Sequence, residues 1–149
     1  MDNNDQVKAL NELIETTVDS ITGYEDSATN VENERLREIF RQRANERQQV
    51  VEELRAEVRR LGGTPEDSGT FLGKAHQRFE DLKAAITGRD EQAIVNEVER
   101  GEDYIKGKYE AALNGDLTGE SRTVVERAYQ SVREGHDQIS QLKHGLQAS

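Results

Sequence analysis

The chain has 149 residues, with 20 Lys and Arg against 30 Asp and Glu, a formal net charge of -10. It has no cysteine, which excludes disulfides, zinc–thiolate sites, iron–sulfur clusters and thiol nucleophiles. The acidic charge opposes binding to nucleic acids and anionic membranes, because such binding comes largely from neutralising phosphates. No apolar run suits a membrane span and the N-terminus lacks a secretory signal pattern, so the expected compartment is the cytoplasm.

Apolar residues are few but regularly spaced. Leu, Ile, Val and Phe make up only about 21% of the chain, close to the composition of disordered, highly charged chains. They nevertheless recur at intervals of three and four over long stretches, the pattern of amphipathic helices, and no segment has the alternation of a strand. The sequence therefore predicts one all-α domain over residues 1–149, with a helical core over about 5–146.

Five helices are predicted. In chain order they cover Asp5–Val31, Glu34–Leu61, Thr70–Thr87, Asp90–Asn114 and Glu120–Leu146. Asn30 and Asn33 offer caps around the first corner. Gly62 and Gly63 are expected to end the second helix.

The connections predict the topology. A tight corner joins the first two helices and a short link joins the last two, so each of these pairs runs antiparallel. The segment between the two pairs holds about 28 residues and a helix of roughly 25 Å, enough to return along the bundle. The expected architecture is a four-helix bundle in up-down-down-up order with an extra short helix in the long crossover, which is the ferritin-like arrangement.

Ionisable residues on the apolar stripes are the candidate functional residues, because a bundle core should be apolar. Glu25, Glu46, Glu102 and His136 fall on the stripes of the four long helices, with Glu99 a substitute for Glu102. A rise of 1.5 Å per residue places Glu46, Glu102 and His136 near one level and Glu25 somewhat beyond it. Carboxylates and imidazole suit iron, manganese or zinc, so a metal site is one interpretation.

A buried salt-bridge layer is the alternative interpretation. In it, Arg43 or Arg47 neutralises the glutamates, and His136 is bonded to Tyr24 or Tyr109.

Three glycines lie inside helices directly before polar residues of this group: Gly23, Gly101 and Gly135. Each costs about 1 kcal/mol relative to alanine in a helix interior. They predict a close approach of helices or a small cavity at this level.

Four runs of sequence carry a resemblance to a known family: LNELIETTVDSITGYEDSA, RLREIFRQRANERQQVVEELRAEVRRLGGTPED, GKAHQRFEDLKAAI and EVERGEDYIKGKYEAAL. From about Leu10 to Leu142 the chain resembles a bacterial family of small four-helix-bundle proteins in the ferritin-like superfamily, whose biochemical role is unassigned. The resemblance implies a ferritin-like fold and, loosely, a link to bacterial stress adaptation.

The superfamily's di-iron pattern is a Glu on each of two helices and Glu-x-x-His on each of the other two. Glu25 and either Glu99 or Glu102 would fill the single-carboxylate positions. The other two helices depart from the pattern, because Gln49 stands where the second helix needs His and Arg133 where the fifth needs Glu. The resemblance therefore implies at most a degenerate or single-metal site.

Two classes of function follow from the sequence. The first is a non-catalytic ferritin-like bundle that acts as a structural or interaction protein, with a second copy or another protein as its partner. The second is a protein that binds iron or manganese through a degenerate di-metal site. No motif for nucleotide binding or hydrolase chemistry is present, so no catalytic residue or substrate is assigned.

Overall fold

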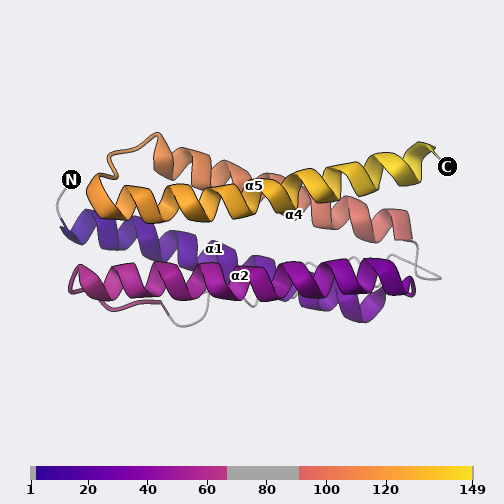
Figure 1. Cartoon of the computed structure of the whole chain (residues 1–149), viewed down its shortest axis with the longest axis horizontal. Coiled ribbons are helices and arrows are strands. Elements are labelled where there is room, and N and C mark those ends of the chain that lie inside the picture. The colour runs from indigo at the N-terminus through magenta and orange to yellow at the C-terminus, as the bar shows by residue number, and fades with distance from the viewer. Residues whose placement is uncertain (1–2, 67–90, 149) are drawn as a thin grey trace.

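The computed structural model describes residues 3–66 and 91–148. They form four long helices (Figure 1): α1 (Asn3–Asn30), α2 (Glu34–Arg60), α4 (Glu91–Leu113) and α5 (Gly119–Ala148). The helix ends lie within two residues of the predicted ones. The predicted crossover helix over 70–87 lies outside the described residues.

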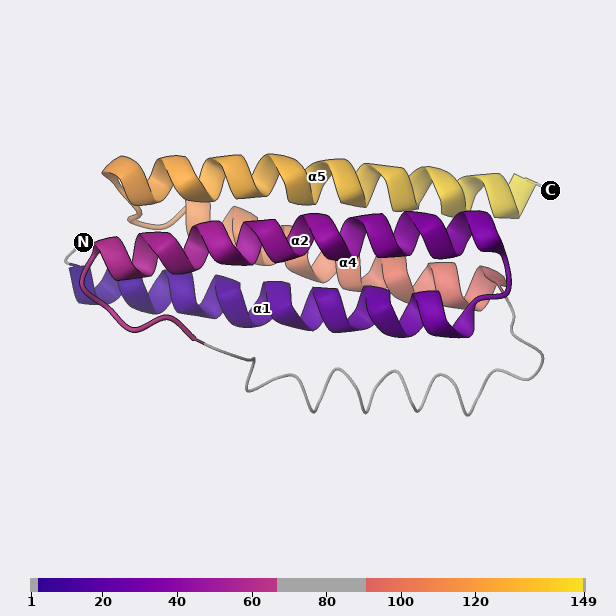
Figure 2. The same ribbon diagram turned by 60° about the horizontal axis from the view of Figure 1, so that its bottom comes forward.

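The four helices form an all-α bundle in the predicted order. α1 and α2 are an antiparallel pair, α4 runs in the same direction as α2, and α5 returns (Figures 1 and 2). α1 packs against both α2 and α4, and α5 packs against both α4 and α2. The up-down-down-up topology, predicted from the lengths of the connections, is confirmed.

Two polar side chains close the corner between α1 and α2. The Asn33 side chain accepts hydrogen bonds from two backbone N–H groups in the first turn of α2, at 2.9 and 3.2 Å. Arg37 donates to the backbone oxygens of Ala28 and Val31, at 3.0 and 2.6 Å. These bonds serve backbone groups that helix ends leave without partners, and the predicted cap at Asn33 is confirmed.

The C-terminal end of α2 depends on two glycines. Gly62 adopts a φ of 84°, and the N–H of Gly63 bonds to the carbonyl of Val58 at 3.0 Å. A Cβ added at Gly63 would lie 2.8 Å from the Val7 side chain, so the chain passes close to α1 here. Both glycines act as predicted, the first by its left-handed backbone and the second by its lack of a side chain.

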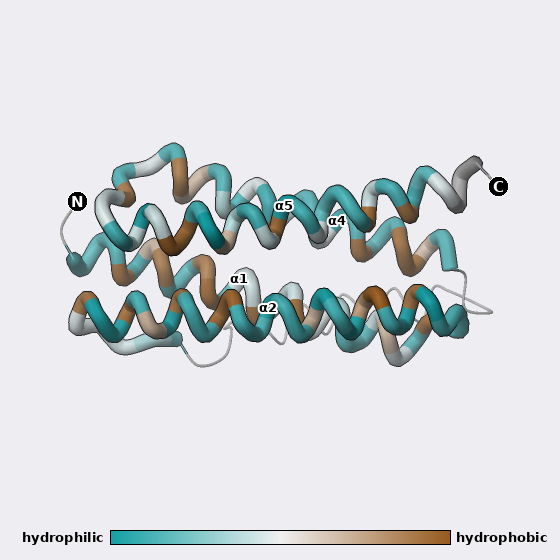
Figure 3. The backbone as a smooth tube through the Cα atoms, viewed as in Figure 1, coloured by the Kyte–Doolittle hydropathy of each residue, from teal (hydrophilic) through white to brown (hydrophobic). Residues whose placement is uncertain are grey.

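The apolar stripes of all four helices meet in one core. Hydropathy alternates along each helix as the stripe turns inward and outward (Figure 3). The fully buried members include Leu10, Ile14, Phe40, Leu54, Val95, Ile105, Val125 and Ile139. This core surrounds the polar residues midway along the bundle.

A polar contact joins α2 to α5 where α2 ends and α5 begins. Glu57 is only 4% exposed. Arg60 binds both of its oxygens at 2.7 Å, and the Ser121 hydroxyl donates to Oε2 at 2.6 Å. Hydrogen bonds from Arg60, and then from Ser121, lower the pKa of Glu57 although burial opposes this. Glu57 therefore holds the two helices together as a carboxylate.

We expect Glu57→Gln to lower the free energy of unfolding at pH 7 by about 1–2 kcal/mol, because charge-assisted hydrogen bonds are lost. Since the pKa of Glu57 is lowered in the folded protein, its contribution is present above the ordinary glutamate pKa and is lost as pH falls through the folded-state value. The difference between wild type and variant in urea unfolding should therefore shrink below about pH 4.

Glu52→Gln is the matched control. Glu52 pairs with Arg55 at the same i,i+3 spacing on α2, but its side chain is 61% exposed. An exposed pair of this kind contributes little. Equal losses in the two variants would contradict the role given to Glu57.

Candidate functional site

A buried ion pair lies at the middle of the bundle. Arg47 on α2 is 1% exposed and Glu102 on α4 is 2% exposed. Arg47 Nη1 donates to Glu102 Oε1 at 2.8 Å, and Nη2 donates to Oε2 at 2.7 Å. Two parallel bonds of this kind are the strongest arrangement of a guanidinium and a carboxylate.

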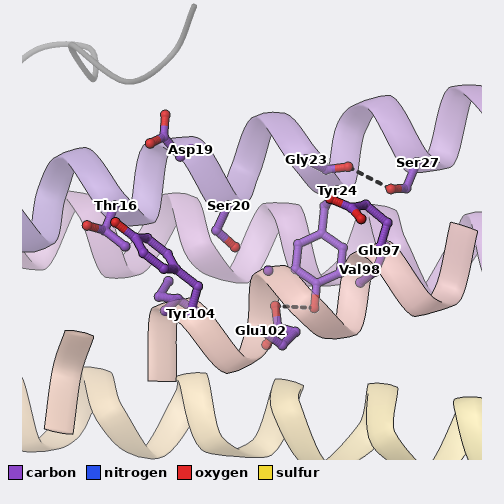
Figure 4. A pocket seen from close by; sticks show the side chains of 12 residues that line it. Thr16, Asp19, Ser20, Gly23, Tyr24, Ser27, Glu97, Val98, Glu102 and Tyr104 are labelled. Carbon is purple, nitrogen blue, oxygen red and sulfur yellow. Dashed lines mark hydrogen bonds between the residues drawn. The ribbon is translucent and has the colours of Figure 1, made fainter. Parts of the chain in front are cut away.

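α1 supplies two further members of what we call the core polar cluster, which comprises Ser20, Tyr24, Arg47 and Glu102. The Tyr24 hydroxyl donates to Glu102 Oε1 at 2.6 Å, as Figure 4 shows. Arg47 Nη1 also donates to Ser20 Oγ at 2.5 Å. The guanidinium carbon lies 5.4 Å from the centre of the Tyr24 ring, within the range of a cation–π contact.

Within the cluster, burial and neighbouring charges shift the pKa values of Arg47 and Tyr24. Burial alone would lower the pKa of Arg47, but the Glu102 carboxylate outweighs burial and raises it above its ordinary value. Burial, and then the charge of Glu102, raise the pKa of Tyr24 well above its ordinary value. At neutral pH Arg47 is therefore a cation and Tyr24 is a neutral phenol that donates its hydrogen.

α5 crosses this level with a glycine, which has no side chain. A Cβ added at Gly135 would lie 2.6 Å from Arg47 Nη2 and 3.4 Å from Glu102 Oε2. The backbone of α5 thus passes directly over the ion pair, and the close approach predicted at Gly135 is confirmed. Gly23 and Gly101 have open space around them and line a pocket, which confirms the other half of that prediction.

Three predicted carboxylates lie away from this centre. Glu25 is exposed on α1. Glu46 is half-buried and accepts hydrogen bonds from side chains of α2 and α5. Glu99, the substitute for Glu102, forms an ion pair with a lysine of α5 at 2.7 Å. Only Glu102 of the predicted set lies in the core.

His136 bridges α5 to α4 at the edge of the bundle. Its Nε2 lies 2.6 Å from Asp103 Oδ1, and its Nδ1 lies 3.3 Å from Asp137 Oδ1. The predicted bond from His136 to Tyr24 or Tyr109 is therefore wrong. The other part of that interpretation, a buried pair between Arg47 and a core glutamate, is confirmed.

Sequence reasoning named Arg47 only as an alternative to Arg43, and it missed the hydrogen bond from Tyr24 to Glu102. A signal for Arg47 was present, because it follows Phe40 and Ala44 and precedes Val51 and Leu54 at spacings of three and four. An arginine on such a stripe requires a buried carboxylate.

The residues of the core do not fit a di-metal centre. Such a centre in this architecture needs four carboxylates and two histidines from facing helices. Here Glu102, the one carboxylate of the predicted set that lies in the core, has both oxygens bound by the Arg47 cation, which would repel a metal ion. Among residues 3–66 and 91–148, no three His, Asp or Glu side chains group to hold a metal.

Comparisons with known proteins establish the family. The profile of a family described as "Domain of unknown function (DUF2383)" matches residues 5–115, so the chain belongs to that family. A comparison with curated proteins finds no match. Within the described part of the chain, no helix is long and apolar enough to cross a membrane.

The chain is also similar to a solved structure, a two-domain protein from Anabaena variabilis that contains DJ-1/ThiJ/PfpI-like and ferritin-like domains. The TM-score is 0.78 at 15% sequence identity, and the match covers 97% of this chain and 40% of that one. The chain thus spans less than half of that protein, and the likeness to its ferritin-like domain shows the fold alone. The expected membership of a family without an assigned role is confirmed, and the fold resembles a ferritin-like domain, as expected.

We expect Arg47→Met to lower the free energy of unfolding by about 3–5 kcal/mol, because Glu102 is left buried without its cation. Glu102→Gln should have a comparable cost for the converse reason. The double variant should lose less than the sum of the two in urea unfolding, because a paired charge is removed together. Arg43→Met and Glu46→Gln, which alter a more exposed pair on α2, are the controls and should each cost little. Additive losses at Arg47 and Glu102 would contradict their coupling.

Gly135→Ala should lower the melting temperature, because the new methyl group would displace Arg47 from Glu102. The free energy of unfolding lost by displacing Arg47 should exceed the roughly 1 kcal/mol by which alanine favours a helix over glycine. Gly107→Ala on α4 is the control, since a Cβ there meets nothing within 4 Å, and it should raise the melting temperature. A similar rise for Gly135→Ala would show that α5 does not need to pass so closely.

Proposed function

We propose that this member of the DUF2383 family is a non-catalytic ferritin-like bundle that acts as a structural or interaction protein. The observation that carries the proposal is the two-bond contact of Arg47 with Glu102 in the centre of the bundle. Bundles of this kind build their metal sites from inward-facing side chains at the core. The guanidinium here neutralises the carboxylate that a metal ion would need.

The rest of the central layer supports the same proposal. Tyr24 uses its hydroxyl hydrogen on Glu102, and Ser20 accepts from Arg47. Gly135 offers no side chain to a ligand on the α5 side. The polar groups of the core therefore bond to one another, and we expect the functional surface to lie on the outer faces of the helices. A second copy of the chain is the partner we expect there.

The alternative is a protein that binds iron or manganese through Glu25, Glu46, Glu102 and His136. It stays a prediction with a direct test. A link to bacterial stress adaptation, which the family resemblance suggested, is likewise a prediction.

Metal content separates the two functions. We expect protein purified without a metal-affinity tag to contain well below one iron or manganese per chain by elemental mass spectrometry, both before and after aerobic Fe(II) addition and desalting. His136→Ala tests the predicted ligand, and His144→Ala, which removes an exposed histidine near the end of α5, is its control. One iron per chain, lost in His136→Ala and kept in His144→Ala, would overturn the non-catalytic proposal. Light scattering on the same samples measures whether the chain is a dimer.

A further inference from the structure

Beside the core polar cluster, α1 and α4 enclose an open pocket of about 100 Å³ (Figure 4). Gly23 of α1 and Gly101 of α4 both line it. A Cβ added at either glycine meets nothing within 4 Å, so no contact among the described residues requires glycine there. Glycine weakens a helix interior relative to alanine, and what the two glycines provide here is the width of the pocket.

Two buried hydroxyl groups on the wall present hydrogen-bond acceptors. Thr16 is buried and donates its proton to the Glu12 carbonyl at 2.9 Å. Ser27 is buried and donates to the Gly23 carbonyl at 2.8 Å. Since each hydroxyl has one hydrogen, both oxygens have only lone pairs left for a ligand.

The charge of the wall is negative. Asp19, Glu97 and Glu102 line the pocket, and none of the described lining residues is basic. Arg47 neutralises Glu102, so the negative charge of the wall comes from Asp19 and Glu97. Glu97 binds Arg100 at 2.6 Å, but the Arg100 side chain is 74% exposed and lies in solvent, whereas that of Glu97 is 18% exposed. A ligand in the pocket therefore meets carboxylates and hydroxyl acceptors rather than cations.

Apolar groups complete the wall. Val98 and Ile105 come from α4, and Tyr24 and Tyr104 add their rings. Each ring already has a basic side chain near it, Arg47 at 5.4 Å from the centre of Tyr24 and Lys108 at 5.5 Å from that of Tyr104, so the rings contribute apolar surface. The space holds about three water molecules, so only a small molecule fits.

We propose that this pocket binds a small organic cation of the alkylammonium class. An ammonium group has three donors and no acceptor, which matches the acceptors of Thr16 and Ser27. Its charge matches the carboxylates of Asp19 and Glu97, and a short alkyl chain packs against Val98 and Ile105. The proposal goes beyond the function proposed above and does not depend on it.

The probe is n-propylammonium chloride, titrated into isotope-labelled full-length protein and followed by the amide resonances of pocket residues. 1-Propanol and sodium propionate are the neutral and anionic probes of equal chain length. We expect saturable shifts with propylammonium and none with the other two. Saturable shifts with propanol of equal affinity would overturn the cation assignment, and the absence of saturation with propylammonium would overturn the site.

Two pairs of variants locate the binding. Gly23→Leu fills the pocket and should weaken propylammonium binding at least about tenfold. Gly107→Leu is the control, because Gly107 also has open space but lies outside the pocket, and it should leave the affinity unchanged. Equal affinities in the two variants would overturn the proposal.

Glu97→Gln tests the charge without filling the pocket and should weaken binding several-fold. Glu99→Gln is its match on α4, because Glu99 has a similarly buried side chain and one basic partner but does not line the pocket. Equal weakening by both variants would show that the effect comes from the overall charge of the protein, and it would overturn the proposed site. This pair also decides the matter if Gly23→Leu does not fold.

Discussion

The ion pair between Arg47 and Glu102 is the constraint to which all four helices adjust. A buried pair is costly unless its geometry is good and its remaining donors and acceptors are satisfied. α2 and α4 supply the charges, and α1 satisfies them through Tyr24 and Ser20. α5 leaves room through Gly135. The layer therefore specifies which faces of the helices meet as well as neutralising its own charge.

The same pair separates this bundle from what its fold alone would suggest. A ferritin-like architecture is compatible with a metal centre, but fold does not determine function. Here a protein cation neutralises the core carboxylate. Glycines have two opposite roles here. Gly135 allows a close approach on one side of the cluster, and Gly23 and Gly101 leave space on the other.

Polar contacts at fixed levels accompany a sparse apolar core. Asn33 and Arg37 close one end of the bundle, the core polar cluster lies in the middle, and Glu57 joins α2 to α5 at the other end. Each of these contacts can form in only one register of the helices. With about a fifth of the chain in large aliphatic and Phe residues, these contacts help to specify how the helices pair.

Periodicity and connection lengths in the sequence determined the four helices, their ends and their order, because both are local properties of the chain. They also located the polar level, since the rise of a helix is constant. Rotation about the helix axes was decided only by tertiary packing. Tyr24 takes the place predicted for Glu25, Arg47 that of Glu46, and Gly135 that of His136. One residue turns a helix by about 100°, and an apolar stripe is wide enough to hold either neighbour, so the helix packed against it selects which one faces inward.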